Sequence, residues 1–202
     1  MKLIKISFYN FLFTLIIILI IELMFGHWFD KDNFGHYMRE HRMKKNEYTL
    51  LLDGKTYNFT YERNYYGFIG KDIKPKDIKA LFVGGSTADE RYKPRRFSIV
   101  GNLNKKLSDK GINIKIVNAG IEGQSTLGHL NNFNTWFKKL ENFNPKVIIF
   151  YIGINDHLAD LDNLDERRNR DGLMTNPDKK EMISDYLKSS SIFYDLLRKT
   201  KH

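Results

Sequence analysis

Apolar residues fill the start of the chain almost without interruption. Within residues 6–29 the only charged side chain is Glu22, and residues 11–21 are nearly all apolar. With its flanks this run supplies about 20 residues, the length that crosses a bilayer as a helix. A buried core helix would normally carry a polar stripe, and a cleaved signal peptide would end in a pair of small residues, whereas Gly26 stands alone. We therefore predict an uncleaved transmembrane signal anchor over residues 1–29, with residues 6–29 in the membrane.

A second pattern follows in residues 30–75. The first part of this segment is polar and charged, which indicates a juxtamembrane linker. Two strand-like runs come next, residues 48–52 and 55–61, with the dipeptide Asp53-Gly54 between them. Asp-Gly between two such runs is a strong short-range hairpin signal. The segment is therefore expected to be a linker and a β-hairpin that lead into the remaining domain.

From residue 76 to residue 202, short apolar runs alternate with amphipathic stretches. The apolar runs cover residues 80–83, 112–117 and 147–152. Continuous apolar strands separated by amphipathic helices are typical of a parallel sheet covered on both faces. This pattern predicts an α/β domain.

Helical spacing separates and follows these strands. Apolar residues recur three or four positions apart in two segments between the strands, and two more helical segments close the chain; these four helices are expected at residues 97–107, 127–140, 178–188 and 191–201. Ser189 or Ser190 is the expected N-cap of the last helix, since serine side chains favour that position.

The composition of the chain excludes several kinds of chemical site. The chain has 202 residues and no cysteine, which excludes disulfide scaffolds, cysteine-ligated metal sites and thiol nucleophiles. The formal charge is +9, but lysine and arginine are scattered along the sequence, so we expect no nucleic-acid partner. No carboxylate–histidine cluster has metal-ligand spacing, and no phosphate-binding glycine motif follows the first strand. Neither a metal nor a cofactor is predicted.

Small and polar residues follow each of the three predicted strands. They occupy residues 84–87, 118–123 and 153–156 and include Ser86, Gly123 and Asn155. Ligands in open α/β sheets collect beyond the carboxyl ends of the strands, so these segments are expected to share one edge. Each residue also has a structural interpretation: Ser86 as a helix N-cap, Gly123 as a positive-φ position and Asn155 as a turn residue.

Together the three segments resemble the first three blocks of the SGNH (GDSL-type) hydrolases, in the family's order, and residues 64–70 resemble its lead-in. The resemblance spans residues 64–201. It implies a flavodoxin-like α/β/α sandwich and ester hydrolysis through an acyl-serine intermediate. It also implies that Ser86 is the nucleophile, with an oxyanion hole made by the Ser86 and Gly123 N–H groups and the Asn155 amide.

The family resemblance also shapes the expected biology. It implies acyl or acetyl esters of a carbohydrate or lipid as substrates. The apolar run predicts a single-pass membrane protein, and the resemblance implies that its C-terminal domain lies outside the cytoplasm, in the periplasm or the extracellular space.

One family block is missing. A serine hydroxyl is a weak nucleophile without a base, and the family supplies that base from an Asp-x-x-His block. None of the six histidines has Asp three positions before it. His157, beside Asp156, is the nearest candidate and is interpreted as a loop residue, while His129 is interpreted as a surface or packing residue.

Only three strands are predicted where the family fold has five, which indicates a sheet that is incomplete at its C-terminal side and a truncated chain. Two alternatives therefore remain open beside the hydrolase. One is a non-catalytic, membrane-tethered binding module of the same fold. The other is a polysaccharide O-acyltransferase, which would use the same acyl-serine and a different acceptor.

Overall fold

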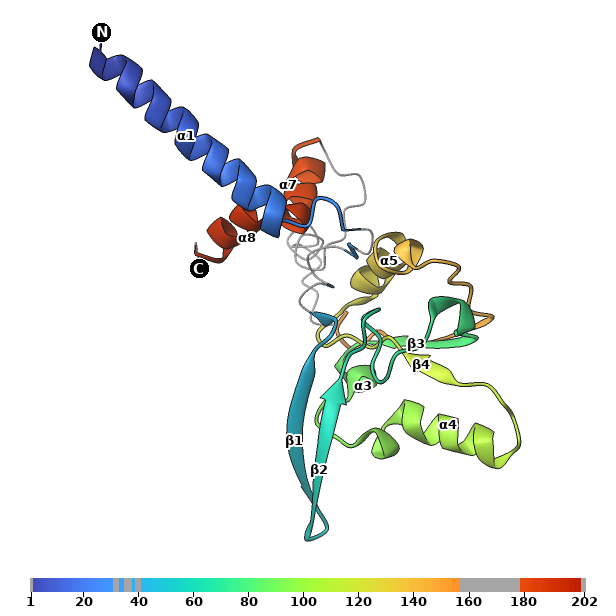
Figure 1. Cartoon of the computed structure of the whole chain (residues 1–202). Coiled ribbons are helices and arrows are strands. Elements are labelled where there is room, and N and C mark those ends of the chain that lie inside the picture. Colours follow the sequence, from blue (N-terminus) through green and yellow to red (C-terminus); the bar gives the residue numbers. More distant parts are fainter. Residues whose placement is uncertain (1, 31–32, 35–37, 39–40, 157–178, 201–202) are drawn as a thin grey trace. The chain divides into compact units, whose positions relative to one another are not determined.

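A computed structural model describes residues 2–30, 33–34, 38, 41–156 and 179–200 (Figure 1). The chain forms two compact units. The first combines residues 1–36 with residues 176–202, and the second comprises residues 37–175.

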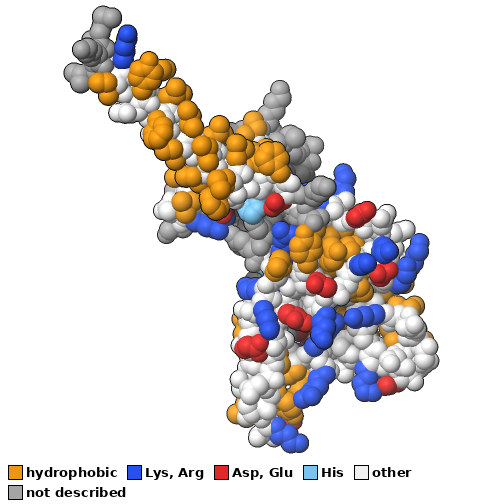
Figure 2. Space-filling model, viewed as in Figure 1, with side chains coloured by type: hydrophobic (Ala, Val, Ile, Leu, Met, Phe, Trp, Pro, Cys, Tyr) orange, Lys and Arg blue, Asp and Glu red, His pale blue; other side chains and the backbone are white. Residues whose placement is uncertain are grey.

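The first unit contains the long helix α1 (Lys2–Phe25) with α7 (Lys179–Ser190) and α8 (Ile192–Lys199). The predicted apolar helix is confirmed, and Figure 2 shows hydrophobic side chains along its length. The span Ile4–Phe25 is not buried anywhere within the protein. By length and composition, α1 is able to cross a membrane once.

The C-terminal end of α1 contacts the N-terminal end of α8. The Glu22 carboxylate accepts hydrogen bonds from the backbone N–H groups of Ile192 (3.1 Å) and Phe193 (3.2 Å) and from Nε1 of Trp28 (3.0 Å). The first N–H groups of a helix lack intrahelical partners, so Glu22 satisfies two of them. The one charged residue of the apolar run therefore has a structural role.

Ser191 is the N-cap of α8, and its hydroxyl accepts a hydrogen bond from the Tyr194 N–H at 3.0 Å. The prediction of Ser189 or Ser190 was wrong by one or two positions. Both of those serines belong to the last turn of α7, and the carbonyl of Ser190 accepts a hydrogen bond from the His27 N–H.

The second unit contains the predicted hairpin, which is confirmed. Strands β1 (Lys45–Leu52) and β2 (Lys55–Glu62) pair antiparallel, with Leu52 opposite Lys55. Asp53 and Gly54 both have positive φ, at 50° and 70°, as the tightest hairpin turn requires. Side chains alternate along both strands between a half-buried face and an exposed one.

A three-stranded parallel sheet lies at the centre of this unit, which confirms the α/β class. The order is β4-β3-β5, and the strands are β3 (Ala80–Gly84), β4 (Ile116–Asn118) and β5 (Val147–Tyr151). The short helix α3 (Ser86–Asp89) follows β3, and α4 (Ile99–Asp109) precedes β4. Between β4 and β5 lies α5 (Thr126–Asn134). Three single 3₁₀ turns complete the described elements, at Pro75–Asp77, Arg95–Phe97 and Phe137–Lys139.

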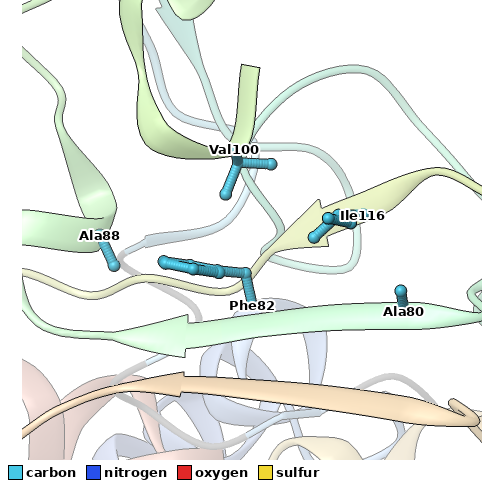
Figure 3. Close-up of a cluster of buried hydrophobic side chains, with 5 residues drawn as sticks. All are labelled: Ala80, Phe82, Ala88, Val100 and Ile116. Atoms are coloured by element: carbon cyan, nitrogen blue, oxygen red, sulfur yellow. The ribbon is translucent and has the colours of Figure 1, made fainter. Parts of the chain in front are cut away.

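One side of the sheet packs against α3 and α4. The buried cluster there contains Ala80, Phe82, Ala88, Val100 and Ile116 (Figure 3). Residues 80, 82 and 84 of β3 share a face because side chains alternate along a strand. Phe68, Trp136, Phe137 and Phe143 form a separate aromatic cluster, with Trp136 and Phe137 ring centroids 4.6 Å apart.

The observed elements depart from the sequence predictions in three places. The strand predicted over residues 112–117 is shorter in the structure, where β4 covers only Ile116–Asn118. Ile112 lies outside it because its N–H donates a hydrogen bond to the Leu107 carbonyl at the end of α4. The predicted helix 127–140 ends at Asn134, and fully buried Trp136 directs its Nε1 to the Tyr66 carbonyl at 2.6 Å.

The third departure concerns coverage of the sheet. Every residue of β3 and β4 is buried, as predicted. In β5, Val147, Phe150 and Tyr151 are about half exposed. Because β5 is the last strand of the described sheet, the prediction of coverage on both faces is wrong for this strand.

Candidate active site

The segments that follow β3, β4 and β5 meet at the carboxyl edge of the sheet. A side chain added at Gly85 would lie 2.6 Å from Nδ2 of Asn155. That same Nδ2 donates a hydrogen bond to the Gln124 carbonyl at 2.9 Å. The Ile121 N–H also donates a hydrogen bond to the Gly84 carbonyl at 2.9 Å. Residues from all three predicted segments are therefore in contact, and a side chain at Gly85 would displace the Asn155 amide.

Ser86 is the first residue of α3, and its side chain is exposed. The N-cap position belongs to Gly85, so the alternative of Ser86 as helix N-cap is wrong. The residue instead presents its hydroxyl at the start of a helical turn, directly beyond the buried central strand.

Gly123 and Asn155 lie in the two flanking segments. Gly123 has φ +74° and open space where a side chain would stand, so its backbone conformation is the feature that requires glycine. Asn155 is half-buried, and its bond to Gln124 orients the amide. The structure brings both residues to the edge that carries Ser86, and their catalytic roles stay predictions.

Two polar side chains bind these segments to the neighbouring helices α3 and α5. Asn118 donates from Nδ2 to the Ala88 carbonyl (2.7 Å) and accepts from the Gly120 N–H (2.8 Å). Asp156 accepts from the Thr126 N–H at 2.7 Å and from the Thr126 hydroxyl. Since Thr126 begins α5, this carboxylate lies at a helix N-terminus, where negative charge is favourable.

A buried ionic network supports the turn after β3. Asp89 accepts hydrogen bonds from the Tyr61 hydroxyl (2.6 Å) and from Arg91 (2.8 Å), and its carboxylate lies 3.3 Å from Arg63. The side chains of Arg63 and Asp89 are each 1% exposed. Arg91 also pairs with Glu122 at 2.6 Å.

The network links α3 to the hairpin and to the segment after β4. The guanidinium of Arg63 donates to the Tyr61 hydroxyl (2.7 Å), to the Gly67 carbonyl (2.8 Å) and to the Gly120 carbonyl. Burial raises the pKa of Tyr61, and the Asp89 carboxylate raises it further. The pKa of Arg91 is also raised, because its bonds to Asp89 and the charge of Glu122 outweigh its partial burial.

A sequence signal for this network existed. Tyr57, Phe59 and Tyr61 alternate on the half-buried face of β2, and Arg63 continues the same period of two. An arginine at an inward-facing position indicates a buried partner, because an unpaired buried charge is costly.

The histidines divide between the two units. His157 lies outside the described residues. His129 is buried in α5, which matches the packing interpretation. His27 belongs to the other unit and pairs with Asp30 at 2.6 Å. Within the described part of the chain, no histidine is hydrogen-bonded to Ser86, and no group of three or more metal-binding side chains gathers there.

No family model and no curated protein matches the chain. Solved structures of one esterase are similar over part of it. AlinE4, described as an SGNH-hydrolase family esterase, is 26% identical over 47% of this chain and 50% of its own, with a TM-score of 0.37. Two mutants of AlinE4 match over the same shares at 25–26% identity and a TM-score of 0.36. The chain therefore spans half the length of these esterases.

Proposed function

We propose that this chain carries the nucleophile and the oxyanion-binding groups of a serine ester hydrolase of the SGNH type. The observation that supports the proposal is the contact of the Asn155 amide with the Gly85 turn and the Gln124 carbonyl. Together with the hydrogen bond from the Ile121 N–H to the Gly84 carbonyl (2.9 Å), this contact joins the three segments whose residues resemble the family blocks, beside an exposed serine.

In the proposed reaction, the Ser86 oxygen forms a bond to the acyl carbon while the hydroxyl proton passes to a base. The tetrahedral oxyanion accepts hydrogen bonds from the Ser86 and Gly123 N–H groups and from the Asn155 amide. The bond to the alcohol oxygen then breaks, the alcohol leaves with the proton, and water releases the acyl group from Ser86. The base is not assigned among the described residues; His157, interpreted above as a loop residue, is the nearest histidine in sequence to the third segment and is the first to test for that role.

We further propose that residues 6–29, most of which belong to α1, anchor the protein in a membrane, with the C-terminal domain on the non-cytoplasmic side. The substrates would be acyl or acetyl esters of carbohydrates or lipids. Proteolysis of sealed vesicles tests the orientation. Protection of residues 37–156 in right-side-out vesicles would contradict it.

A fluorophosphonate probe tests the hydrolase proposal directly. The serine oxygen attacks phosphorus and fluoride leaves with the hydroxyl proton as HF, so the full chain in a lipid nanodisc gains the mass of the probe less that of HF. We expect labelling that the Ser86→Ala variant loses and that Ser108→Ala retains, since Ser108 is an exposed serine at the end of α4. A folded chain that no probe labels would rule out the hydrolase.

The non-catalytic binding module is the second candidate. It is supported by the observation that, among the described residues, Ser86 has no histidine partner. It predicts no labelling of Ser86, together with ligand binding that Ser86→Ala leaves unchanged. A His157→Gln variant adds a further distinction, because only the hydrolase predicts that this change slows labelling.

A further inference from the structure

A groove of about 700 Å³ opens beside Ser86. This size falls within the range of small-molecule sites. One wall comes from strand β1 of the hairpin, and another comes from the segment that joins α3 to α4. Tyr151, at the end of β5, also lines it.

Apolar side chains form the two walls. Leu50 and Leu52 project from the same face of β1, two residues apart. Tyr92 and Phe97 line the groove from the facing segment and are partly exposed, at 63% and 36%. Both rings pack on the hairpin without a ligand: Tyr92 on Tyr48 and Phe97 on Tyr57, each with centroids 5.3 Å apart.

The charges along the groove pair with one another. Arg91 bonds to Asp89 (2.8 Å) and to Glu122 (2.6 Å), and Lys93 bonds to Glu90 (2.8 Å). Opposite charges that are already paired leave little field for an ionic ligand. Both the walls and the charge balance therefore favour an uncharged apolar occupant.

We propose that this groove binds the aliphatic acyl chain of the ester that reacts at Ser86. The inference rests on the proposed function and narrows its substrates to esters of medium or long acyl chains. Because the acyl carbon becomes bonded to the Ser86 oxygen, the chain attached to that carbon begins at a residue that lines the groove. An acetyl group has no such chain and would leave the groove empty.

Photo-crosslinking tests the groove independently of catalysis. The Ser86→Ala variant of the whole chain, in nanodiscs, is irradiated with the uncharged ethyl ester of octanoate, which carries a diazirine at its terminal acyl carbon. We expect adducts on peptides that contain residues 50–52 and 92–99, competed by the same octanoate ester without the diazirine. Leu50→Asp lowers these adducts at least fivefold, whereas Leu51→Asp does not, because Leu51 is 71% exposed and does not line the groove. Adducts confined to other peptides would overturn the proposal.

Leu52→Asp provides a second variant in case Leu50→Asp fails to fold. Leu52 lines the same groove and is 43% exposed, next to the turn of the hairpin. A charge there places a carboxylate in the path of the chain at less risk to packing. Adducts that persist unchanged in a folded Leu52→Asp variant would contradict the assignment.

The dependence of the labelling rate on the length of the probe's alkyl chain tests the groove through the reaction at Ser86. Ethyl, butyl and octyl fluorophosphonates are compared on the wild-type chain by their second-order labelling rate constants. Full burial of one methylene is worth about fourfold in binding, so half-burial gives about twofold, and the octyl probe should exceed the butyl probe on the order of tenfold. Leu51→Asp keeps this ratio, and Leu50→Asp brings it near one.

The two measurements separate failure of this inference from failure of the proposed function. Labelling at equal rates by all three probes would refute the acyl groove and support the hydrolase. Octanoate adducts at residues 50–52 without any labelling of Ser86 would refute the hydrolase and support the apolar site.

Discussion

Arg63 should be among the residues whose loss most destabilises the second unit. Its guanidinium is 1% exposed, lies 3.3 Å from Asp89 and donates to Tyr61, Gly67 and Gly120. In the Arg63→Met variant the methionine fills part of the volume, but two carbonyl groups and one hydroxyl lose a donor. Removing one partner of a buried ion pair costs about 3–5 kcal/mol.

Because Asp89 keeps Arg91 as a cationic partner, the expected loss in the free energy of unfolding lies at the lower end of that range. Asp89 keeps its bond to Arg91 at 2.8 Å, so the buried carboxylate is not left without a cation. We expect a loss of about 3 kcal/mol in the free energy of unfolding. For a domain stable by about 5–15 kcal/mol, this loss is a large fraction of the total. With urea slopes of about 1–3 kcal/mol per molar, the midpoint should fall by about 1–3 M.

Fluorescence of Trp136 supplies the assay, because this tryptophan is fully buried in the same unit and bonds to Tyr66. A Trp28→Phe background removes the only other tryptophan. Urea unfolding is followed in detergent micelles for the parent, Arg63→Met and the control Lys105→Met. Lys105 pairs with Asp109 at an exposed site, with side chains 72% and 58% exposed, so its loss should cost no more than about 0.5 kcal/mol.

Arg63→Lys is a second variant, which keeps the prediction testable if Arg63→Met does not fold. Lysine keeps the charge but loses the planar fork that reaches several acceptors at once, so its midpoint should lie between those of the parent and Arg63→Met. If Arg63→Met unfolds at the parent's midpoint with the same slope, the network is energetically neutral and the reasoning fails.

Three further results are expected. Burial and the Asp89 carboxylate raise the folded pKa of Tyr61 above its ordinary value of 10.0. The stability that the neutral phenol contributes is therefore complete below about pH 10 and declines as the pH rises above it. Above about pH 10, the urea midpoint should therefore fall less steeply with pH in Tyr61→Phe than in the parent. Asn155→Ala should slow fluorophosphonate labelling about 10²–10³-fold, and equal rates would remove the amide from the oxyanion site. Gly123→Ala and Gly111→Ala, both at positive φ in open space, should lose similar stability by thermal melting, but only Gly123→Ala should slow labelling.

The hairpin and the order of strands and helices were predictable because they depend on local patterns. Asp53-Gly54 specifies a turn by its own backbone preferences, and the apolar runs mark strands regardless of what covers them. The ends of elements were less predictable. Ile112 is as apolar as a strand residue, yet it lies outside β4 because its N–H closes the end of α4, a choice made by tertiary structure.

In the candidate site, too, local patterns predicted some features and only the tertiary structure determined the others. The shared edge of Ser86, Gly123 and Asn155 followed from the rule that parallel strands end together. The ionic network did not, because Arg63 and Asp89 come together only when the hairpin packs on α3. The acyl groove likewise combines residues of β1 with residues some 40 positions later in the sequence, a distance over which no periodicity carries information.

The strand order also sets when the domain is able to fold during synthesis. Ala80 of the central strand pairs with Ile116 on one side and with Val147 on the other. At roughly 5–20 residues per second, about 3–13 s pass between synthesis of Ala80 and synthesis of Val147. The hairpin, whose partners are neighbours in sequence, has no such delay. During that interval the central strand, which is buried along its whole length, has unpaired backbone groups on its β5 side, so holdase chaperones that bind nascent chains should associate with residues 80–84 before any other part of the second unit.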